Sequence, residues 1–434
     1  MHNVAQQFAF HSVDLAPGIR AFIQPTEQFR RIHVAAFLHL PLSEETVAGA
    51  ALLPQILRRG TRKHPAAIDL ENTLADLYGA SLHAGVHKIG DRQVQTFSLS
   101  LPADAYVSEP VFNAGLELLR AVMFEPAEQD GGFLPDYVEQ EKQLQIGRIR
   151  SLINQKIQYA VTRCVSEAFS HEPYGLYILG TEEGVASLDR EGLWALHQKL
   201  LAESPIDVYV VGAVDPDQVA SQLKAALALD RPAPQPLPPT HVEIRQGDAR
   251  EIIQEEPMEQ AWLVHCLRSN ISYGDPARWA LMMFNGLLGG TTQSKLFMNV
   301  RERASLAYAA ASQYDSNKGV ILAFAGIAPD NYEQASQLMQ EQVEALRRGD
   351  ISDDEWEGTL RSLITRLRST ADSPAGLILR HLQGAVEGVE QTIEEAIEGL
   401  ESLSREQVAE VGQQLQLDTV FLLRGKAKQP APVG

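Results

Sequence analysis

A glycine-rich turn followed by an arginine and a tyrosine is the stretch of this sequence whose residue types could do chemistry. Residues 285–308 read NGLLGGTTQSKLFMNVRERASLAY, with Gly289 and Gly290 in the turn and Arg301 and Tyr308 seven residues apart. Glycine lets the backbone take left-handed angles or come close to another chain. Arginine offers a planar fork of donors, and tyrosine offers a hydroxyl. We therefore take Arg301 and Tyr308 as candidate binding residues, with the turn placing them.

The elements that must position this stretch belong to a long, acidic chain. A length of 434 residues exceeds one ordinary core and suggests two or more domains. An apolar content of 44% and a charged content of 21% are those of a soluble globular protein. The net charge of −19 argues against nucleic acid and anionic membranes as partners. Solubility is the simplest reason for such a charge, although a chamber that draws basic peptides is also compatible with it.

Cysteine usage and the absence of long apolar runs indicate a cytoplasmic protein. The only cysteines are Cys164 and Cys266, so no disulfide framework is implied, and we expect both in the core. The first residues show no basic and apolar segments typical of a signal peptide. No run approaches the roughly 20 apolar residues of a membrane span. We therefore expect a cytoplasmic location.

Hydrophobic periodicity predicts the same kinds of elements in both halves of the chain. In residues 95–102 the pattern alternates, which indicates a strand with one buried face. Ser352 and Glu355 form a capping box that opens a helix. The other predicted strands are 20–26, 32–40, 207–215 and 261–269, and the predicted helices are 46–59, 66–77, 109–123, 135 onwards, 189–202, 276–288, 331–347, 353–371 and 374–388.

A proline-rich segment divides the chain. Residues 231–240 read RPAPQPLPPT, which suits a semi-rigid spacer and not a regular element. We place an N-terminal domain at residues 1–230, the linker at 231–240 and a C-terminal domain at 241–434. The second half repeats the order of the first: an apolar strand, a helix and a Gly-Thr pair, and finally an apolar strand closing with glycine. This duplication points to two similar α/β domains.

The glycine turn and the residues after it resemble the C-terminal half of the pitrilysin (insulinase) family of zinc metallopeptidases, the inverzincins. The matching residues are Ser294, Leu296, Phe297, Val300, Arg301, Glu302, Leu306, Ala307 and Tyr308. The segment 171–201 and the strand at 207–215 also look like family segments. The resemblance implies an α+β fold of two similar domains, each a mostly antiparallel sheet packed with helices, that forms half of a clamshell. It also implies that Arg301 and Tyr308 contact a peptide substrate, with Gly289 and Gly290 beside them.

The zinc motif of the family is absent. Active members carry His-x-x-Glu-His just before a Gly-Thr, and here Gly60-Thr61 is preceded by Ala51, Leu52, Leu53, Pro54 and Gln55. An alanine methyl group cannot bind zinc, and proline cannot act as the general base. A later family helix carries two glutamates seven residues apart, and the positions here are Glu141 and Arg148. Arg148, a cation, therefore stands at a ligand position.

The side chain of Arg148 is predicted to occupy the volume of the missing ion. Leu134, Val138, Glu141, Gln145, Arg148 and Leu152 share one stripe at helical spacing. We expect Arg148 to be buried and to pair with acidic neighbours, of which Glu141 is one candidate, because an unpaired buried charge is costly.

Two histidines offer another place for a metal. His83 and His87 lie four residues apart in a predicted strand and so share a face, but no carboxylate is spaced as a third ligand. In the family this segment is the edge strand that pairs with the substrate backbone. Ala84 matches its pattern, while His83 replaces an asparagine. We therefore treat His83 and Ala84 as candidate substrate-binding residues.

The resemblance implies a non-catalytic, substrate-binding subunit of a zinc metallopeptidase. Zinc is expected in a paralogous partner with an intact His-x-x-Glu-His, in a heterodimer to which this chain supplies Arg301 and Tyr308; a homodimer is the other assembly. A first alternative is a structural scaffold or peptide-binding protein of the same fold. A second is a hydrolase that uses some other site.

The first testable prediction concerns the metal. Because Ala51, Pro54 and Gln55 replace the motif, the isolated chain should bind no stoichiometric zinc and should cut no peptide. Elemental analysis after incubation with zinc, and a peptidase screen with and without chelator, measure the two properties. One tightly held zinc per chain would show that another set of ligands had been overlooked.

Overall fold

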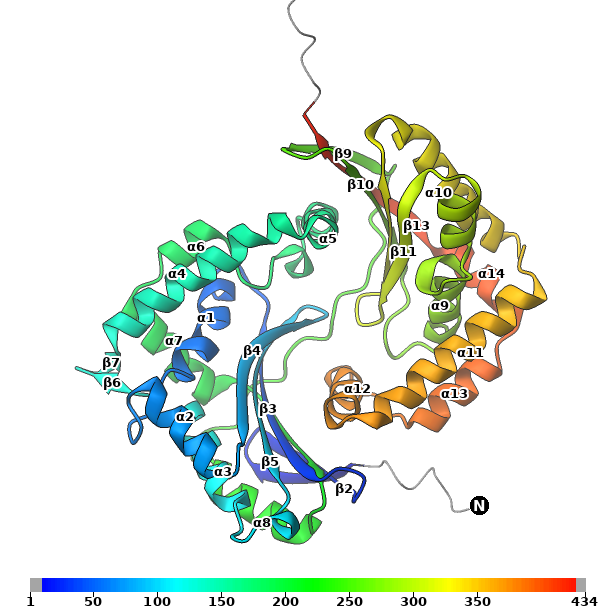
Figure 1. Cartoon of the computed structure of the whole chain (residues 1–434). Coiled ribbons are helices and arrows are strands. Elements are labelled where there is room, and N and C mark those ends of the chain that lie inside the picture. Colours follow the sequence, from blue (N-terminus) through cyan, green and yellow to red (C-terminus); the bar gives the residue numbers. More distant parts are fainter. Residues whose placement is uncertain (1–9, 427–434) are drawn as a thin grey trace, which may run out of the picture. The chain divides into compact units, whose positions relative to one another are not determined.

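The computed structural model describes residues 10–426 of the chain (Figure 1). Contacts divide it into two compact units. The first unit contains the chain up to Ser151 together with Leu176–Pro239 and Ala371–Gln383. The second contains Leu152–Gly175, Thr240–Thr370 and the chain from Gly384 onwards. Neither unit is therefore continuous in sequence, because two segments cross the proline-rich boundary.

The first unit is built on a six-stranded sheet in the order β1-β2-β8-β3-β5-β4. All neighbours are antiparallel except β2 and β8, which are parallel. Phe97, Leu99 and Leu101 of β5 are fully buried while the residues between them are half-exposed, as the alternation predicts. The strands are β1 (His11–Ala16), β2 (Ile19–Pro25), β3 (Arg31–Pro41), β4 (Ser81–Ile89), β5 (Arg92–Pro102) and β8 (Ile206–Gly212).

Helices cover one face of this sheet, and β6 and β7 form a small separate hairpin (Figure 1). The core between helices and sheet is made of aliphatic and aromatic residues from β2, β3, β5, β8, α1 and α3. The elements are α1 (Val47–Leu57), α2 (Ala67–Asp76), α3 (Phe112–Phe124), α4 (Pro135–Ser151), α6 (Glu182–Ala186), α7 (Arg190–Glu203), α8 (Pro216–Leu227), β6 (Glu128–Gln129) and β7 (Gly132–Phe133).

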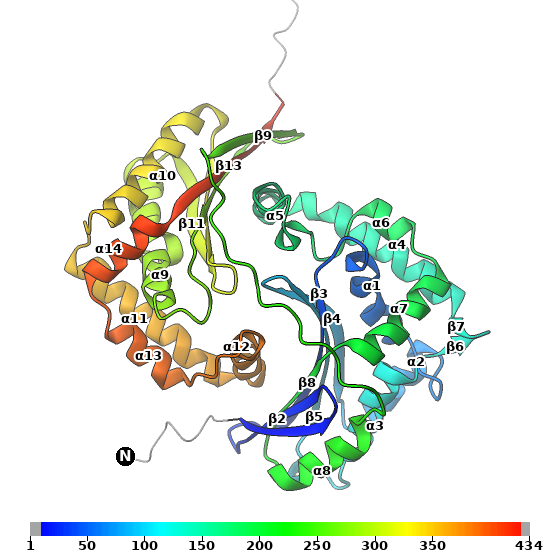
Figure 2. The same ribbon diagram turned by 180° about the vertical axis from the view of Figure 1, so that it is seen from behind.

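The second unit repeats this topology in a five-stranded sheet with the order β11-β12-β10-β13-β9. Figure 2 shows β9, β11 and β13 of this sheet from behind. Its last strand, β13, pairs parallel with β9 and antiparallel with the central β10, as β8 does with β2 and β3. The duplication and the α+β fold predicted above are confirmed. The strands are β9 (Arg250–Glu256), β10 (Ala261–Arg268), β11 (Ala307–Asp315), β12 (Val320–Ile327) and β13 (Gln416–Gly425).

The helices of the second unit include one that begins with the predicted capping box. The Ser352 hydroxyl and the Glu355 carboxylate each accept the other residue's backbone N–H at the start of α11. The helices are α9 (Arg278–Asn285), η5 (Gly286–Gly290), η6 (Leu296–Arg303), α10 (Tyr332–Arg347), α11 (Asp353–Ser369), α13 (Ile393–Glu401) and α14 (Arg405–Gln414).

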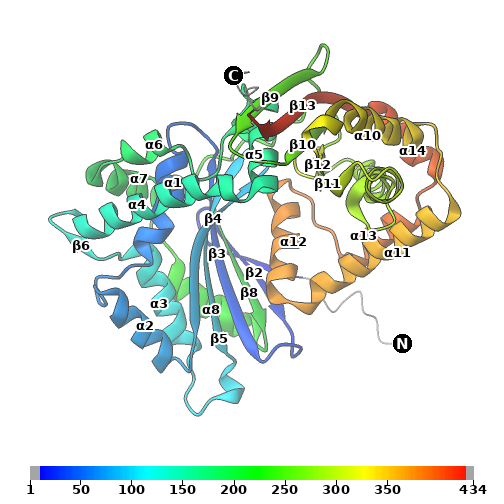
Figure 3. The same ribbon diagram turned by 45° about the horizontal axis from the view of Figure 1, so that its top comes forward.

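Two helices at equivalent places in the repeat belong to the opposite unit. α5 (Lys156–Ala168) follows α4 but packs in the second unit, on the face of the sheet away from α10 and α14 (Figure 3). Residues 371–383, which include most of α12 (Pro374–Val386), belong to the first unit. There, the His381 ring contacts the Phe22 ring at a tilt, with centroids 4.8 Å apart, and forms a 2.9 Å hydrogen bond with the Tyr209 hydroxyl. The exchange is reciprocal, since α5 and α12 each follow the long helix of their own repeat.

Apolar and ionic contacts hold the exchanged segment in the second unit. Cys164 of α5 packs with Trp262 and Cys266 in one core, so both cysteines are core residues as predicted. Beyond α5, the Glu172 carboxylate pairs with Arg268 at 2.6 Å and with Lys318 at 2.9 Å. The two cationic side chains are only 5% and 1% exposed. Glu172 is therefore a counter-ion shared by two buried positive charges, and Asp418 lies 3.8 Å from Arg268 as a second one.

A substitution at Glu172 should destabilise the second unit. Glu172→Gln keeps the shape but removes the carboxylate nearest to two buried cations, and the other carboxylate at Arg268, that of Asp418, lies 3.8 Å away, so we expect a loss of about 3–5 kcal/mol. Denaturant unfolding measures it. As the control, Glu255→Gln in the same unit breaks a half-exposed pair with Arg424 and should cost less than about 1 kcal/mol. Equal effects of the two substitutions would contradict a special role for Glu172.

Candidate functional site

The zinc-motif positions lie on α1, and none offers a ligand to a metal. Ala51 and Pro54 are buried in the packed face of the helix. Gln55 is half-buried, and its side-chain amide donates a 3.0 Å hydrogen bond to the Ala84 carbonyl of β4. Gln55 therefore connects the first helix to the edge of the sheet.

Arg148 does not fill the place of an ion, so that prediction is wrong. Its side chain is exposed on α4, and no ion pair involves it within residues 10–426. The buried carboxylate of Glu141 pairs instead with Arg59 at 3.1 Å. Gln145, one turn before Arg148, reaches α1, where its amide donates to the Ala48 carbonyl. Ile146 and Ile149 pack with Ala48 and Val185, whereas Arg148 lies on the exposed side of α4.

A zinc ion does not fit the residues at these positions. A methyl group, a proline ring, a hydrogen-bonded amide and an exposed guanidinium supply no anionic or imidazole ligand. Across residues 10–426, no group of three or more His, Cys, Asp or Glu side chains is placed to hold a metal. The four motif positions of the first unit therefore offer no structural basis for metal-assisted hydrolysis.

The candidate substrate strand of the first unit is an edge strand. β4 stands at the end of the sheet order, beside β5, and its His83 and His87 are both exposed, as residues four apart on one strand face should be. His83 and Ala84 thus lie where an added strand could pair. However, the Ala84 carbonyl already accepts the Gln55 amide.

In the second unit, Arg301, Tyr308, Gly289 and Gly290 line one cavity of about 1590 Å³. Its wall includes the turn at the end of η5, the helix η6, the helix α11 and β11, which is the edge strand equivalent to β4. Arg301 and Tyr308, seven residues apart in sequence, thus line the same cavity.

The glycine turn works by close approach and not by left-handed angles. Gly286, Gly289 and Gly290 are absent from the positive-φ residues of the described chain, and Gly286–Gly290 continues α9 as a π-helical turn. A Cβ atom on Gly289 would collide with the backbone amide of Ser312 in β11. The Ser312 hydroxyl also donates a 2.7 Å hydrogen bond to the Asn285 side-chain oxygen. The turn is therefore fixed directly against the edge strand.

η6 divides its apolar residues between core and cavity. Leu296 and Val300 are fully buried, whereas Phe297 lines the cavity. The guanidinium of Arg301 lies 4.5 Å from the centre of the Phe297 ring, close enough for a cation–π contact. Phe297 therefore supports Arg301 from within the cavity. The Arg301 side chain is about two-fifths exposed, and its nearest carboxylate is Glu302 at 3.5 Å.

Tyr308 stands at an irregularity of β11, where the pairing with β12 shifts register between Ala307 and Ala309. Its ring lies edge-on to Trp262, with centroids 5.4 Å apart, and directly over Gly326, where any Cβ atom would collide with it. Tyr308 is 44% exposed. Burial of the rest of the ring raises the pKa of the hydroxyl, so it carries its proton at neutral pH and can donate a hydrogen bond.

Sequence reasoning missed part of this cavity. Trp262 and Gly326 fix Tyr308 from two other strands, and α11 contributes charged residues to the lining. The arginines among them are Arg361 and Arg366, and two arginines five residues apart on a helix are an ordinary surface pattern. Only the packing of α11 against the turn shows that these side chains belong to the cavity.

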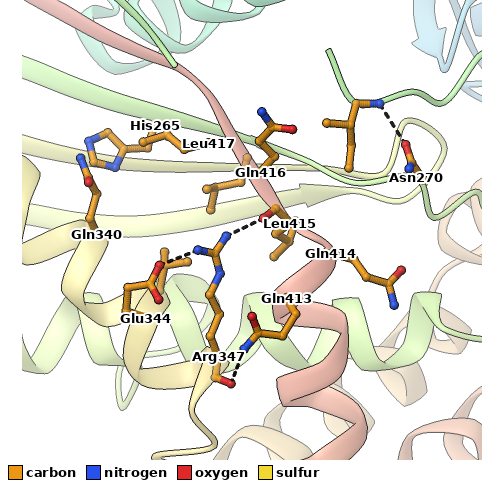
Figure 4. Close-up of a pocket in the computed structure, with 13 residues that line it drawn as sticks. His265, Asn270, Gln340, Glu344, Arg347, Gln413, Gln414, Leu415, Gln416 and Leu417 are labelled. Atoms are coloured by element: carbon orange, nitrogen blue, oxygen red, sulfur yellow. Dashed lines mark hydrogen bonds and ion pairs between the residues drawn. The ribbon is translucent and has the colours of Figure 1, made fainter. Parts of the chain in front are cut away.

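A second, smaller cavity of about 600 Å³ lies between α10, α14 and the start of β13 (Figure 4). Arg347 binds the Glu344 carboxylate and the carbonyls of Gly412 and Leu415. Gln413 donates to the Arg347 carbonyl at 2.9 Å. Burial lowers the pKa of His265 to about 4, so its ring is neutral at neutral pH. These groups satisfy one another and connect the two helices to the strand.

Comparison with known proteins gives the family. A model of the peptidase M16 inactive domain matches residues 187–363. The probable inactive metalloprotease YmfF of Bacillus subtilis strain 168 is 35% identical over 410 residues, which cover 94% of this chain and 96% of that protein. The chain belongs to the M16 peptidase family. It is an inactive M16 peptidase-like protein, and the resemblance of its motifs to the pitrilysin family is confirmed.

Solved structures share the M16 fold along almost the whole chain. A conserved protein from Enterococcus faecalis V583 is similar with a TM-score of 0.91 and 27% identity, covering 97% of this chain and 100% of that one. A peptidase M16 inactive domain from Pseudomonas fluorescens has a TM-score of 0.79 at 16% identity, with coverage of 97% and 100%. In residues 10–426 of this M16 protein, no helix has the length and apolar character needed to cross a membrane.

Two arginines near the degenerate site should respond differently to substitution. Arg148→Ala removes an exposed side chain and should change the free energy of unfolding by no more than about 0.5 kcal/mol. Arg59→Ala leaves the buried Glu141 carboxylate uncompensated and should cost about 1–3 kcal/mol. Denaturant unfolding of both variants measures the difference. A larger loss for Arg148→Ala would mean that its side chain is buried after all.

Proposed function

We propose that this protein is the non-catalytic, substrate-binding subunit of a heterodimeric zinc metallopeptidase that acts on peptides. The observation that carries the proposal is the pair Arg301 and Tyr308: both line one cavity, both are partly exposed, and both are supported from behind by aromatic rings. Side chains that are held in place by packing and remain partly exposed at a cavity are typical of a binding site and not of a core.

The two side chains have distinct roles in this proposal. The guanidinium of Arg301 would hold a substrate carbonyl or carboxylate through charge-assisted hydrogen bonds. The Tyr308 hydroxyl, protonated at neutral pH, would donate a hydrogen bond to the oxyanion of the tetrahedral intermediate. Trp262 and Gly326 keep the phenol ring in one position, which reduces the reorganisation needed during the reaction.

The zinc and the general base would come from a paralogous partner with an intact His-x-x-Glu-His. Positions 51, 54 and 55 of this chain cannot supply them, and a homodimer would lack them too. In the first unit, His83 and Ala84 on the edge strand β4 would contact the peptide backbone. A cytoplasmic location is part of the proposal, and the two unpaired cysteines support it.

The alternative is a scaffold or peptide-binding protein of the same fold without a catalytic role. It explains the loss of the zinc ligands equally well. It gives no reason for an arginine and a tyrosine that are held at a cavity with few partners of their own. We therefore favour the subunit.

Substitution of the pair tests the proposal in a complex with the zinc-bearing paralogue from the same genome. Tyr308→Phe deletes only a hydroxyl and should lower kcat by about 10²–10³ if that hydroxyl stabilises the oxyanion. Arg301→Ala should do similar or greater damage, because a charge-assisted contact is lost. The measurement is kcat and kcat/KM of the complex for a peptide substrate.

Controls separate catalysis from assembly. Tyr106→Phe and Arg348→Ala change exposed residues outside the cavity lining and should leave turnover unchanged. Zinc content and gel-filtration behaviour should match those of the wild-type complex in every variant. Full activity of both Tyr308→Phe and Arg301→Ala would favour the scaffold.

A further inference from the structure

The cavity around Arg301 differs in charge from the rest of the chain. Five basic residues line it: Lys295, Arg301, Arg303, Arg361 and Arg366. Four acidic residues do so: Asp350, Asp354, Glu355 and Glu357. The lining is thus slightly positive, while the chain as a whole has a net charge of −19. A concave surface that departs from the charge of the whole protein selects ligands by charge.

The two signs are separated along α11, which lines the cavity over most of its length. Asp354 and Glu357 lie in its first half, and Asp350 lies just before it. Arg361 and Arg366 lie in its second half. Twelve residues of helix between Asp354 and Arg366 span about 18 Å. An extended peptide of about five or six residues has the same length.

Several of these charges have no ionic partner within residues 10–426. Lys295 and Glu355 neutralise each other at 2.9 Å. The Arg366 guanidinium donates to the Gly290 carbonyl at 3.2 Å, which holds it over the glycine turn. In the same described range, no ion pair involves Asp354, Glu357 or Arg361, and all three are exposed.

The dipole of α11 explains only part of the pattern, namely Asp354 in the first turn and Arg366 in the last turn. A helix favours acidic residues in its first turn and basic residues in its last turn, where the effect is strongest. Glu357 and Arg361 lie further inside the helix Asp353–Ser369, beyond those turns. Facing the cavity one turn apart, with opposite signs, they mark the point at which its charge changes.

We propose that this cavity binds short peptides with free ends, about five or six residues long, in one fixed direction. The terminal carboxylate lies at Arg361 and Arg366, whose planar guanidinium groups suit bidentate contacts. The terminal ammonium group lies at Asp354 and Glu357. The inference rests on the proposed peptide-binding function and adds a substrate class: peptides recognised by both ends, as distinct from internal stretches of long chains.

Blocking the ends of one peptide tests the inference on the full-length chain alone. The probe is a synthetic hexapeptide of alanine, serine and glycine, prepared with free ends, N-acetylated, C-amidated, and blocked at both ends. Isothermal titration calorimetry measures the dissociation constant of each form. Each block removes one charge-assisted contact, so we expect it to weaken binding about tenfold or more.

Paired variants assign each end of the peptide to its own residues. Arg361→Gln with Arg366→Gln should abolish the effect of amidation and keep that of acetylation. Asp354→Asn with Glu357→Gln should do the reverse. Arg348→Gln, an exposed arginine outside the lining, serves as the control and should change neither effect. Because each variant must retain one effect, a misfolded variant cannot imitate the expected result.

The outcomes distinguish this inference from the proposed function. If the doubly blocked peptide binds as tightly as the free one, recognition of the ends is excluded, while peptide binding stands. If the end effects persist in both paired variants, the ends bind elsewhere and the assignment to α11 fails. If no form binds, and turnover of the complex is also indifferent to Arg301→Ala and Tyr308→Phe, both proposals fall together.

Discussion

The second unit depends on one carboxylate supplied by the first half of the chain. Glu172 neutralises Arg268 and Lys318, which are buried among strands β10 and β12 and lie over the Phe169 ring. Two cations in so dry a place are tolerable only with a partner in direct contact. The same segment brings Tyr174, whose hydroxyl donates to Asp315 at 2.7 Å, and α5, whose Ile157 forms part of the wall of the large cavity.

The absence of a side chain at two glycines sets the geometry of the binding pair. At Gly289 the turn touches the backbone of β11, and at Gly326 the strand β12 leaves room for a phenol ring. Tyr308 therefore lies against Trp262 and over Gly326. Neither glycine is used for its conformational freedom, since neither has a positive φ. Both matter because a Cβ atom would occupy space that another group already fills.

Much of the fold was predictable because alternation and helical periodicity are local. The buried Phe97, Leu99 and Leu101 and the capping box at Ser352 follow from neighbouring residues alone. Motif spacing was enough to propose the Arg301 and Tyr308 pair and the lost zinc ligands. The exposure of Arg148 could not be predicted, because helical periodicity shows which face of a helix a side chain shares but not whether another element packs over it. The roles of Trp262, Arg361 and the exchanged helices depend on contacts distant in sequence, for which a single sequence carries no signal.

The exchange of α5 and α12 affects the order in which the chain can fold. The sheet of the first unit is encoded before residue 213, yet the helix that contacts Phe22 and Tyr209 through His381 is made only after residue 370. During synthesis, the aromatic residues on that sheet remain uncovered until more than a hundred further residues have been made. In the same way, α5 is made before the strands against which it packs, β10, β12 and β13. Contacts between segments so distant in sequence close slowly, and apolar surface exposed meanwhile is open to aggregation. Because of this reciprocal exchange, each unit needs a segment from the other half of the chain before its fold is complete.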